Sequence, residues 1–328
     1  MFNSRTILIT GGTGSWGQEL TRVLLSYNPR EIRIFSRSEF SQVQMQRDFN
    51  NHPSIKFIIG DVRDYDAVLN ACKGVDYVYH LAALKHVPIC ELQPDEALKT
   101  NVLGTENVIR ASIQQDVKKV MDVSTDKAVD AANFYGLTKV YGERLMIRAN
   151  ELSETTRFVC IRGGNVLGTR GSVVPFFKQL ILENKEIPLT STEMTRFFLT
   201  ITEAITLLIK ASHDAVGGEI FVMKMKACRI LDLTNVLCKN ITKNSIQIVE
   251  KGIRPGEKLH EDLISRYETE RTYYYGEDYY VILPSTPSTA LSNKYNQLPK
   301  VSFSSYSSDS SLLSEAEIEE MLKSGGFC

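Results

Sequence analysis

The sequence predicts an α/β fold, in which a doubly wound parallel sheet is joined by a smaller, interleaved C-terminal domain. Up to about residue 165, short apolar runs alternate with helical patterns, and a glycine-rich turn follows the first run directly. Short and nearly continuous apolar runs are typical of strands that are covered on both faces. Strand–helix alternation of this kind predicts a parallel sheet with right-handed crossovers.

The expected elements follow one another along the chain. Apolar runs predict strands at residues 6–10, 32–35, 55–59, 77–79, 120–123 and 158–161. Helical patterns predict helices at residues 96–115, 134–150, 173–182, 202–211, 231–238 and 314–322. Prolines and loops interrupt the alternation after Arg162. Residues 1–165 are therefore expected to form the sheet domain, with some later segments returning to it, and residues 166–328 mainly the smaller domain and a polar tail.

The composition excludes several classes of protein. The 328 residues carry 38 Lys and Arg against 39 Asp and Glu, a net charge of −1, which gives no bulk attraction to nucleic acid or to an anionic membrane. There is no signal-peptide core and no long apolar run, so a cytoplasmic protein without a membrane segment is expected. The cysteines lack CxxC spacing, which predicts free thiols and no zinc site; they are Cys72, Cys90, Cys160, Cys228, Cys238 and Cys328.

A glycine-rich turn marks the candidate dinucleotide site. Gly11, Gly14 and Gly17 stand three residues apart, where the first strand ends and a helix begins. Glycines allow a tight turn and let the backbone approach a pyrophosphate, whose charge the start of the helix favours. We therefore interpret the turn as the start of a Rossmann-type site. Its other expected cofactor contacts are Thr13, Ser15 and Trp16.

The end of the second strand indicates which dinucleotide is bound. A carboxylate there would bond the ribose 2′-hydroxyl of NAD, but this chain has Ser36 and Arg37. Arg37 can pair with a 2′-phosphate, so the sequence favours NADP. After the third strand, Asp61 and Val62 are placed for the adenine edge, although a helix N-cap also explains Asp61. Further expected cofactor neighbours follow the fourth strand, at Ala82, Ala83 and Lys85.

Two pairs of residues carry the predicted chemistry. Tyr135 and Lys139 share one face of a helix that follows the strand ending at Thr125. An ammonium beside a phenol lowers the pKa of the phenol, which gives a base that takes a hydroxyl proton while hydride leaves to a nicotinamide. Asp126 and Lys127, at the strand end, supply an acid and a base for an elimination. The lysine is a useful base only if its pKa is lowered.

These motifs together resemble those of the extended short-chain dehydrogenases/reductases. Other segments narrow the resemblance to the configuration-inverting UDP-N-acetylglucosamine 4,6-dehydratases; they are residues 84–88, 164–168, 170–175, 194–197 and 252–261. The resemblance runs over almost the whole chain. Its most specific parts are the last two segments and the sequence Thr125-Asp126-Lys127.

The resemblance implies a reaction without an external reductant. Tyr135, assisted by Lys139 and Thr125, removes the 4-hydroxyl proton while the C4 hydride goes to NADP. Lys127 then takes the C5 proton, Asp126 protonates the departing 6-hydroxyl, and hydride returns to C6. A proton returned to the opposite face of C5 gives UDP-2-acetamido-2,6-dideoxy-L-arabino-hex-4-ulose. Retaining relatives typically carry Asp-Glu in place of Asp126-Lys127, and inversion is expected for this reason.

The resemblance also implies the substrate contacts and an assembly. UDP-N-acetylglucosamine is the expected substrate, and Lys85 and His86 are expected beside its sugar. The residues expected to hold UDP are Asn165, Val173, Arg196, Arg254 and Glu257. Helices equivalent to 96–115 and 134–150 often pair between subunits, so a homo-oligomer, a dimer or a hexamer, is expected. One departure is Gly163, where the family commonly has an aromatic residue whose loss could loosen the sugar pocket.

Other interpretations stay open at this point. A UDP-sugar 4-epimerase, or a dehydratase that retains C5 or stops at the 5,6-ene, uses the same fold. An epimerase does not need an acid–base pair such as Asp126-Lys127. A non-catalytic NADP-binding sensor belongs to a different class, which the presence of Tyr135 and Lys139 disfavours. No metal is expected, because the histidines are isolated and His-Glu-x-x-His is absent from the sequence.

Overall fold

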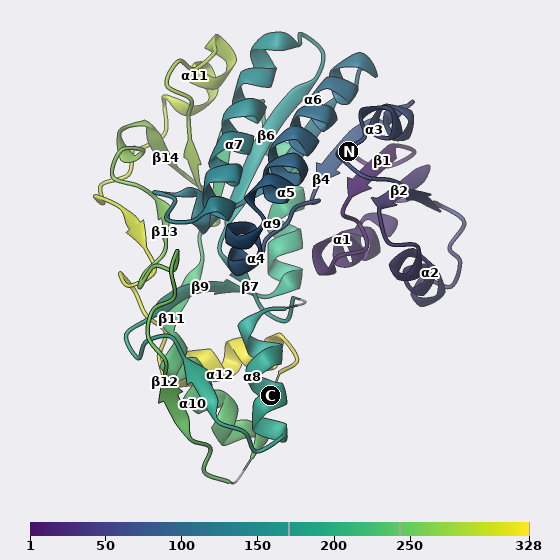
Figure 1. Ribbon diagram of the computed structural model, residues 1–328. Helices are drawn as coiled ribbons and strands as arrows, with labels where there is room; N and C mark the ends of the chain where they lie inside the picture. The colour runs from purple at the N-terminus through teal and green to yellow at the C-terminus, as the bar shows by residue number, and fades with distance from the viewer. Residues whose placement is uncertain (170, 243, 328) are drawn as a thin grey trace.

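The computed structural model describes residues 1–169, 171–242 and 244–327, and a large sheet forms its centre (Figure 1). Within these ranges the sheet has nine strands, in the order β14 (Thr272–Tyr275), β15 (Tyr279–Ile282), β10 (Ile220–Met223), β6 (Arg157–Gly163), β5 (Lys119–Thr125), β4 (Tyr77–His80), β1 (Thr6–Thr10), β2 (Glu31–Ser36) and β3 (Ile55–Ile59). Neighbouring strands from β3 to β10 are parallel, and the hairpin of β15 and β14 is antiparallel. The predicted α/β fold with a parallel sheet is confirmed.

Helices cover the two faces of this sheet. On one face α3 (Tyr65–Cys72), α6 (Gly104–Gln114) and α7 (Phe134–Leu152) pack side by side, and on the other α1 (Ser15–Leu25) packs against α9 (Ile201–Asp214). The remaining helices and turns around the sheet are α2 (Glu39–Asp48), α4 (Val87–Leu92), α5 (Pro94–Leu98), η1 (Lys99–Leu103), η2 (Asp126–Ala128), η3 (Thr269–Arg271) and α11 (Thr289–Tyr295).

The strand order fixes where a ligand can bind. From β1 the chain continues to β2 and β3 on one side, whereas β4, β5 and β6 lie on the other side. Every residue of β1 and β4 is buried, as strands covered on both faces require. In open α/β sheets, ligands bind in the crevice at the carboxyl ends of the strands where the order reverses. The segments after Thr10 and His80 meet at this point.

The helix predicted at residues 96–115 departs from regular geometry in its middle. α5, the π-helical turn η1 and α6 follow one another, and the backbone stays helical at both junctions. Asn101 lies in the π turn, and its side chain bonds the backbone N–H and carbonyl of Leu84, both at 2.8 Å. π turns of this kind often stand at functional sites. Here the turn holds the segment that follows β4.

A second hydrophobic core lies below the sheet in Figure 1. Its elements are α8 (Val173–Leu182), α10 (Ile230–Ile241), α12 (Glu315–Ser324), β8 (Ile187–Leu189) and β12 (Ile248–Glu250). A small sheet of β11 (Lys226–Arg229), β9 (Thr195–Leu199) and β7 (Asn165–Val166) lies between the two cores, and β13 (Asp262–Ile264) pairs with β16 (Tyr306–Ser307).

Segments after residue 165 contribute to both cores. α9, β10, β14 and β15 return to the large sheet, whereas α8, α10 and α12 form the second core. The helices predicted at 173–182, 202–211, 231–238 and 314–322 correspond to α8, α9, α10 and α12. The division of the chain at residue 165 stays a prediction.

A buried arginine on β6 joins elements that lie beside β5. The guanidinium of Arg162, on β6, contacts Glu143 of α7 at 2.8 Å and Glu268 at 3.0 Å, and the Arg162 side chain is almost fully buried. Burial raises the pKa of Glu268, but the paired guanidinium outweighs burial and holds this pKa below its usual range. The triad therefore ties α7 to the segment that follows β13.

The remaining predictions on composition can be compared with the described residues. Cys72, Cys90, Cys160, Cys228 and Cys238 are free thiols, and Cys328 lies outside the described residues. Among the described helices, none is long and apolar enough to cross a membrane. The described part of the chain also contains no group of His, Cys, Asp and Glu side chains arranged to hold a metal ion.

Candidate functional site

A cavity of about 750 Å³ opens at the carboxyl ends of β1, β4 and β5. Most residues predicted for the cofactor and substrate line it together, although they are spread from residue 11 to residue 257. They are Gly11, Thr13, Gly14, Ser15, Trp16, Gly17, Ser36, Arg37, Asp61, Val62, Ala82, Ala83, Lys85, His86, Thr125, Lys127, Tyr135, Asn165, Val173, Arg196 and Glu257. Asp126, Lys139 and Arg254 are not among the lining residues.

The glycine turn after β1 has no room for side chains. A Cβ atom on Gly11 would lie 2.9 Å from the Cα atom of Ala82, and one on Gly17 would lie 2.3 Å from the carbonyl oxygen of Gly12. Gly14 is the N-cap of α1 and offers no side-chain cap. The first N–H groups of α1 thus face the cavity as anion donors. The turn fits the diphosphate of a dinucleotide.

The end of β2 presents an exposed cation. The Arg37 side chain is 55% exposed, and its guanidinium lies 4.0 Å from the Asp61 carboxylate, whereas Arg63 contacts Asp61 at 2.6 Å. Burial raises the pKa of Asp61, but the hydrogen bonds and charge of Arg63 outweigh burial and lower it. The N-cap of α3 is Asp64, so the alternative that Asp61 is a helix cap is wrong. Arg37 remains available for a 2′-phosphate.

The acid–base residues at the end of β5 form one hydrogen-bonded cluster. Asp126 is fully buried, and its Oδ1 accepts hydrogen bonds from the Thr125 hydroxyl at 2.9 Å and from the Lys127 ammonium at 3.0 Å. Its Oδ2 is buried without a partner. The Lys127 Nζ also lies 3.5 Å from Glu261, whose carboxylate is 3.9 Å from Arg196. Lys127 therefore lies between two carboxylates.

Lys127 does not have the lowered pKa that a lysine base requires. Burial lowers the pKa of Lys127, but the charges of Asp126 and Glu261 outweigh burial and raise it. Burial raises the pKa of Glu261, and repulsion by Asp126 adds to this effect. Lys127 is thus an ammonium that must lose a proton before it can act as a base.

Tyr135 has a raised pKa, against the expectation from sequence. Burial raises the pKa of the Tyr135 phenol, and the charges of Lys139 and Lys127 offset burial only in part. The Lys139 ammonium lies 3.2 Å from a carboxylate oxygen of Asp122. The cation that was expected to act on the phenol alone is therefore also paired with a carboxylate.

Tyr135 reaches the cluster because α7 packs directly on the segment after β5. A Cβ atom on Gly136 would lie 2.1 Å from the carbonyl oxygen of Lys127. The Asn133 side chain caps α7 by accepting from the Gly136 N–H at 2.8 Å, and it donates to the Gly256 carbonyl at 2.8 Å. The start of α7 is therefore fixed between η2 and the loop that carries Glu257.

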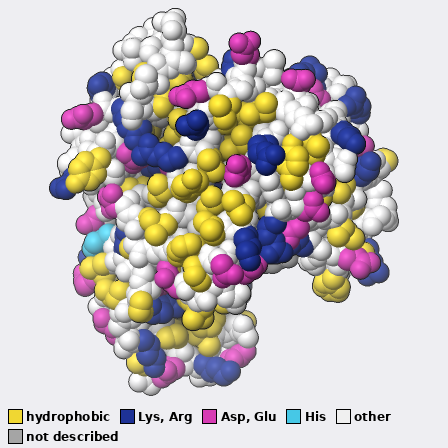
Figure 2. All heavy atoms as spheres, turned by 45° about the horizontal axis from the view of Figure 1, so that its top comes forward, with side chains coloured by type: hydrophobic (Ala, Val, Ile, Leu, Met, Phe, Trp, Pro, Cys, Tyr) yellow, Lys and Arg dark blue, Asp and Glu magenta, His cyan; other side chains and the backbone are white. Residues whose placement is uncertain are grey.

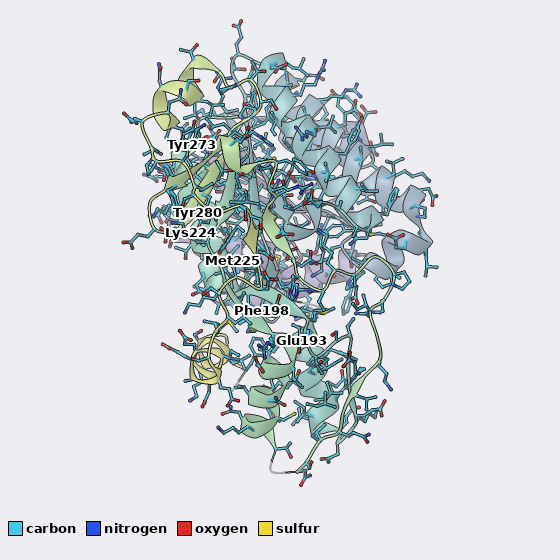
Figure 3. All side chains as sticks on the ribbon, turned by 90° about the vertical axis from the view of Figure 1, so that its left-hand side faces the viewer. Glu193, Phe198, Lys224, Met225, Tyr273 and Tyr280 are labelled. Atoms are coloured by element: carbon cyan, nitrogen blue, oxygen red, sulfur yellow. The ribbon has the colours of Figure 1, made fainter. Side chains whose placement is uncertain are left out.

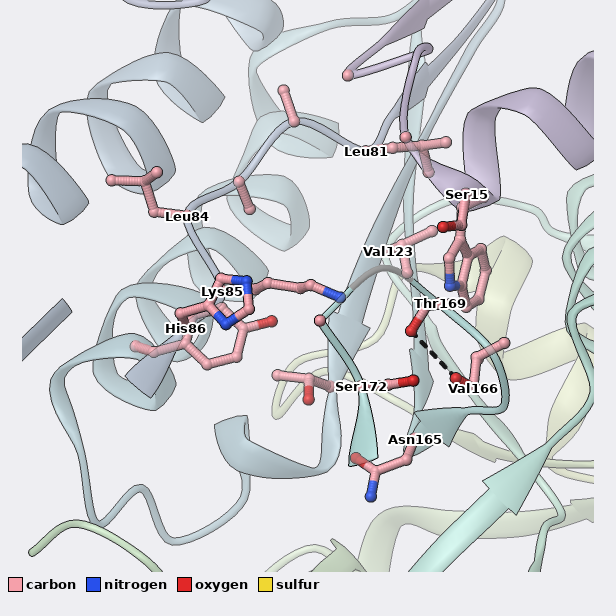
Figure 4. Close-up of a pocket in the computed structure, with 18 of the residues that line it drawn as sticks. Ser15, Leu81, Leu84, Lys85, His86, Val123, Asn165, Val166, Thr169 and Ser172 are labelled. Atoms are coloured by element: carbon pink, nitrogen blue, oxygen red, sulfur yellow. Dashed lines mark hydrogen bonds between the residues drawn. The ribbon is translucent and has the colours of Figure 1, made fainter. Parts of the chain in front are cut away.

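Residues expected to hold the substrate line the opposite wall. In Figure 4, Lys85 extends across the cavity toward the segment with Thr169, and Asn165 and Ser172 lie on that far side. Burial lowers the pKa of Lys85, and repulsion by Lys127 adds to this effect. A Cβ atom on Gly171 would lie 2.6 Å from the His86 ring, so His86 supports this segment. Arg170, part of one resembling motif, lies outside the described residues.

The two predicted arginine ligands are placed differently. Arg196 is buried, and its guanidinium donates to the carbonyls of Thr195, Lys258 and Leu259 at 2.6–3.0 Å. Arg254 is 64% exposed and contacts Glu257 at 2.6 Å. Arg196 therefore holds the backbone beside the cavity, and Arg254 is available at the rim through its contact with Glu257.

Two residues that line the cavity, Ser124 and Glu261, were not singled out from the sequence as site residues. Glu261 lines the cavity, and its Oε2 is buried without a partner, as are the hydroxyls of Ser124 and Ser172. Buried polar atoms usually have partners, so these three atoms point to a polar ligand. Ser172 and Glu261 stand in the segments 170–175 and 252–261 that carried the resemblance, and Ser124 directly precedes Thr125-Asp126-Lys127; this was the available signal. No sequence pattern marked Asp122.

The space above Gly163 is filled. A Cβ atom on Gly163 would lie 3.3 Å from the sulfur of Met223 and 3.9 Å from that of Met225. Met225 lies where the chain passes from the large sheet to the small sheet, which contains Phe198 (Figure 3). The sulfur of Met225 accepts a hydrogen bond from the Gly164 N–H at 2.9 Å. The sulfur atoms of two methionines thus occupy the space beside Gly163, and a looser sugar pocket stays a prediction.

The fold and site are of the short-chain dehydrogenase/reductase type, with a Tyr–Lys pair next to an Asp–Lys pair. Residues 7–283 match the model of a family described as "Polysaccharide biosynthesis protein", and the chain belongs to this family. It is 44% identical to a UDP-N-acetylglucosamine 4,6-dehydratase (inverting) of Campylobacter jejuni, over 98% of both chains. A UDP-glucose 4-epimerase of Rickettsia bellii is also 44% identical, over 85% of this chain and 83% of the relative. The resemblance seen in the sequence is confirmed.

Solved structures show the same architecture. The X-ray structure of Pen from Bacillus thuringiensis superposes with a TM-score of 0.91 at 38% identity, and covers 98% of this chain and 99% of that chain. A dTDP-glucose 4,6-dehydratase, DesIV of Streptomyces venezuelae with NAD and DAU bound, has a TM-score of 0.71 at 20% identity, over 77% of this chain and 86% of that chain. At this low identity, the similarity to DesIV supports only a common fold.

Substitution of Gly136 by Ala tests the close packing of α7. The new methyl group would meet a backbone oxygen, so Gly136→Ala is expected to lower the free energy of unfolding by about 2 kcal/mol or more. In the same helix, a Cβ atom on Gly142 would lie 3.9 Å from its nearest neighbour. Gly142→Ala is the matched control and is expected to raise stability by about 0.5–1 kcal/mol. Urea denaturation measures both, and equal effects would contradict the role of Gly136.

Proposed function

We propose that the protein is a UDP-N-acetylglucosamine 4,6-dehydratase that inverts C5 and uses NADP. The observation that carries the proposal is the cluster of Asp126 and Lys127 beside Tyr135 at one end of the cavity. Such a cluster offers an acid and a base in addition to the base that oxidises C4. The name of the Campylobacter jejuni relative supports the same reaction.

The residues present fit NADP. The glycine turn would hold the diphosphate, Arg37 the 2′-phosphate, and Asp61 with Val62 the adenine. When bound, the nicotinamide accepts hydride from C4 and later returns it to C6. Ala82, Ala83 and Lys85 would border the rest of the dinucleotide.

Tyr135 would begin the reaction by taking the proton of the 4-hydroxyl. The Lys139 ammonium and the Thr125 hydroxyl stabilise the phenolate, because both lower the pKa of Tyr135 against the effect of burial. Loss of hydride then leaves a ketone at C4. The ketone acidifies the C5 proton and prepares the sugar for elimination.

One proton transfer would create both the acid and the base of the elimination. In the resting cluster, Lys127 is an ammonium that donates to Asp126 Oδ1 at 3.0 Å. Transfer of this proton along the hydrogen bond gives a neutral amine and a carboxylic acid. The amine of Lys127 takes the C5 proton, and the acid of Asp126 protonates the departing 6-hydroxyl. Closure of the cavity around a substrate favours the neutral pair, because ions lose hydration there.

The UDP part of the substrate would lie against the segments of β7, α8 and the Gly256 loop. Asn165 and Val173 line this side, and the free Ser172 hydroxyl offers a polar contact. Arg254 and Glu257 would bind the diphosphate and the ribose at the rim. His86 and Lys85 would border the sugar.

A UDP-sugar 4-epimerase is the second candidate function. The Rickettsia bellii relative of equal identity is named an epimerase, and Tyr135 with a bound dinucleotide would suffice for that reaction. Epimerisation breaks no bond at C5 or C6, so it gives Asp126 and Lys127 no role. The buried acid–base cluster therefore favours the dehydratase.

Proton NMR in deuterated water tests the reaction. Purified protein with UDP-N-acetylglucosamine and no added reductant is expected to give a 4-keto-6-deoxy sugar with deuterium at C5 and coupling constants of an L-configuration. Lys127→Ala is expected to lower the rate of C5 exchange about 100-fold or more, because general-base catalysis is lost. Lys118→Ala, on the surface just before β5, is the control and should keep full activity.

The other outcomes of this experiment are distinct. A D-configured keto sugar would keep the dehydratase and overturn inversion. Conversion to the galacto epimer would support the epimerase, and absence of turnover by NADP-loaded protein would support a non-catalytic sensor.

Arg37→Glu tests the choice of cofactor. A carboxylate at this position would repel the 2′-phosphate, so the affinity for NADP is expected to fall about 10- to 100-fold while that for NAD changes little. Arg47→Glu, on the exposed last turn of α2, is the matched charge reversal that should leave both affinities unchanged. Isothermal titration calorimetry with each dinucleotide measures the effect; equal losses for NAD and NADP would contradict the assignment.

The protein is proposed to form a homo-oligomer, a dimer or a hexamer, through the helices beside α7. Large apolar side chains are exposed there, at Leu92, Leu98, Leu103, Leu137 and Tyr141. Figure 2 shows apolar side chains gathered in the middle of the face that it displays. Exposed apolar patches of this kind mark interaction sites, and a symmetric pairing of α6 and α7 would cover them.

Leu137→Glu tests this interface by sedimentation velocity. A charge in a buried apolar contact is expected to shift the wild-type oligomer to the monomer. Leu182→Glu is the control, because Leu182 is also exposed but lies on α8 of the second core. A wild-type monomer, or the same assembly in all three proteins, would contradict the proposal.

A further inference from the structure

Behind the catalytic tyrosine lies a buried ion pair that the proposed reaction does not use. The Lys139 Nζ donates to both oxygens of Asp122, at 3.3 and 3.2 Å. Asp122 is fully buried in the middle of β5, and Lys139 is almost fully buried. These two hydrogen bonds are the contacts found for the Asp122 carboxylate within the described residues. The carboxylate therefore acts on the rest of the site through Lys139.

Lys139 is the cation that pairs with Asp122, because the other titratable neighbours of Asp122 are uncharged. Asp122 is paired in register with His80 of β4 and Cys160 of β6. Burial lowers the pKa of His80 to about 3, and burial raises the pKa of the Cys160 thiol well above its usual range, so both are neutral near pH 7. His80 also bonds the hydroxyls of Thr10 and Thr105, at 2.7 and 3.1 Å.

The charged groups that face the phenol come from other elements. Asp126 and Lys127 of η2 act on Tyr135 from the side of the cavity, whereas Lys139 acts from within α7. Burial lowers the pKa of Lys139, but Asp122 outweighs burial and raises it. Lys139 is thus charged, and the negative charge of Asp122 compensates part of its field at Tyr135.

We propose that Asp122 is a positioning residue. It pairs with the Lys139 ammonium, weakens the electrostatic effect of this ammonium on Tyr135, and so sets the pH at which Tyr135 becomes a base. This inference rests on the proposed function, because it takes Tyr135 as the base for the 4-hydroxyl. Asp122 touches neither the cavity nor the reacting atoms.

The sign of the effect follows from the net charge of the triad. With Asp122 ionised, the triad of Asp122, Lys139 and neutral Tyr135 carries no net charge, and loss of a proton makes it negative. Without the carboxylate the same loss takes the triad from positive to neutral, which is easier at a buried site. Removing the charge of Asp122 therefore moves the first proton loss of the Tyr135–Lys139 pair to lower pH, and the inference takes Tyr135 as the group that loses this proton while Lys139 stays an ammonium.

Asp122→Asn tests this inference, because the amide keeps the size of the side chain and removes its charge. The rate of nicotinamide reduction in a single turnover of NADP-loaded protein with UDP-N-acetylglucosamine reports the C4 oxidation alone. The acidic limb of its pH profile is expected to move down by about one pH unit or more, which is about a tenfold gain in rate on that limb. The KM is expected to change less than threefold. Asp116→Asn, on the exposed turn just before β5, is the matched control and should leave the profile unchanged.

A second measurement does not depend on the substrate. The near-ultraviolet absorbance of phenolate, taken as the difference between each protein and its Tyr135→Phe counterpart, follows the ionisation of Tyr135 in NADP-loaded protein. The titration is expected at lower pH in Asp122→Asn than in the wild type. If the wild type fails to turn over UDP-N-acetylglucosamine, the proposed function falls, and this titration still decides the role of Asp122.

Asp122→Ala is a second variant for the case that Asp122→Asn misfolds, because it also removes the charge and leaves only a small void. NADP affinity and urea denaturation identify the folded variants. A pH profile and a phenolate titration that stay unchanged, or move to higher pH, in a folded variant would overturn the proposal.

Discussion

The close contact between the start of α7 and the end of β5 controls the rest of the site. The absence of a side chain on Gly136 lets the helix lie against the carbonyl of Lys127. Tyr135 is thereby held beside Thr125 and Lys127, although it stands ten positions after the strand end. Asn133 extends the same contact to the Gly256 loop, so the loop with Glu257 is fixed by the helix that carries the tyrosine. One steric constraint thus aligns three segments around the cavity.

Electrostatic pairing is the second constraint, because a buried charge is stable only with a partner. The site solves this problem with three separate groups: Asp122 with Lys139, Arg162 with Glu143 and Glu268, and Asp126 with Lys127 and Glu261. The arginine group has all its carboxylates bonded and holds the fold. The group with Lys127 keeps two unbonded carboxylate oxygens, Asp126 Oδ2 and Glu261 Oε2, and Glu261 lines the cavity, where a substrate can supply the missing contact. Incomplete pairing therefore separates the reactive group from the structural one.

The sequence predicted the sheet, the glycine turn, the helix α7 that carries Tyr135, and the helix α8. Local periodicity and glycine spacing determine these features. It did not predict the π turn at Lys99–Leu103, whose extra residue depends on the contact of Asn101 with Leu84. The direction of the pKa shift of Tyr135 was also wrong, and the raised pKa of Lys127 was not predicted. Burial raises the pKa of Tyr135, and the charges of Asp126 and Glu261 raise that of Lys127, whose contact with Glu261 exists only in three dimensions. Patterns of neighbouring residues hold no information on such distances.

The two lysines of the site have opposite requirements, and their surroundings differ accordingly. In the proposed reaction Lys139 serves as a permanent cation, and its partner is a fully buried carboxylate with no other hydrogen-bond partner in the described structure. Lys127 must alternate between ammonium and amine, so its partner has to accept a proton. Asp126 can do so, because one of its oxygens already receives the hydrogen bond of Lys127 and its other oxygen is unbonded. An aspartate that receives the proton is then the acid that the departing hydroxyl needs. An Asp–Lys neighbour pair therefore makes a base and an acid from a single proton, which a lysine paired as tightly as Lys139 could not do.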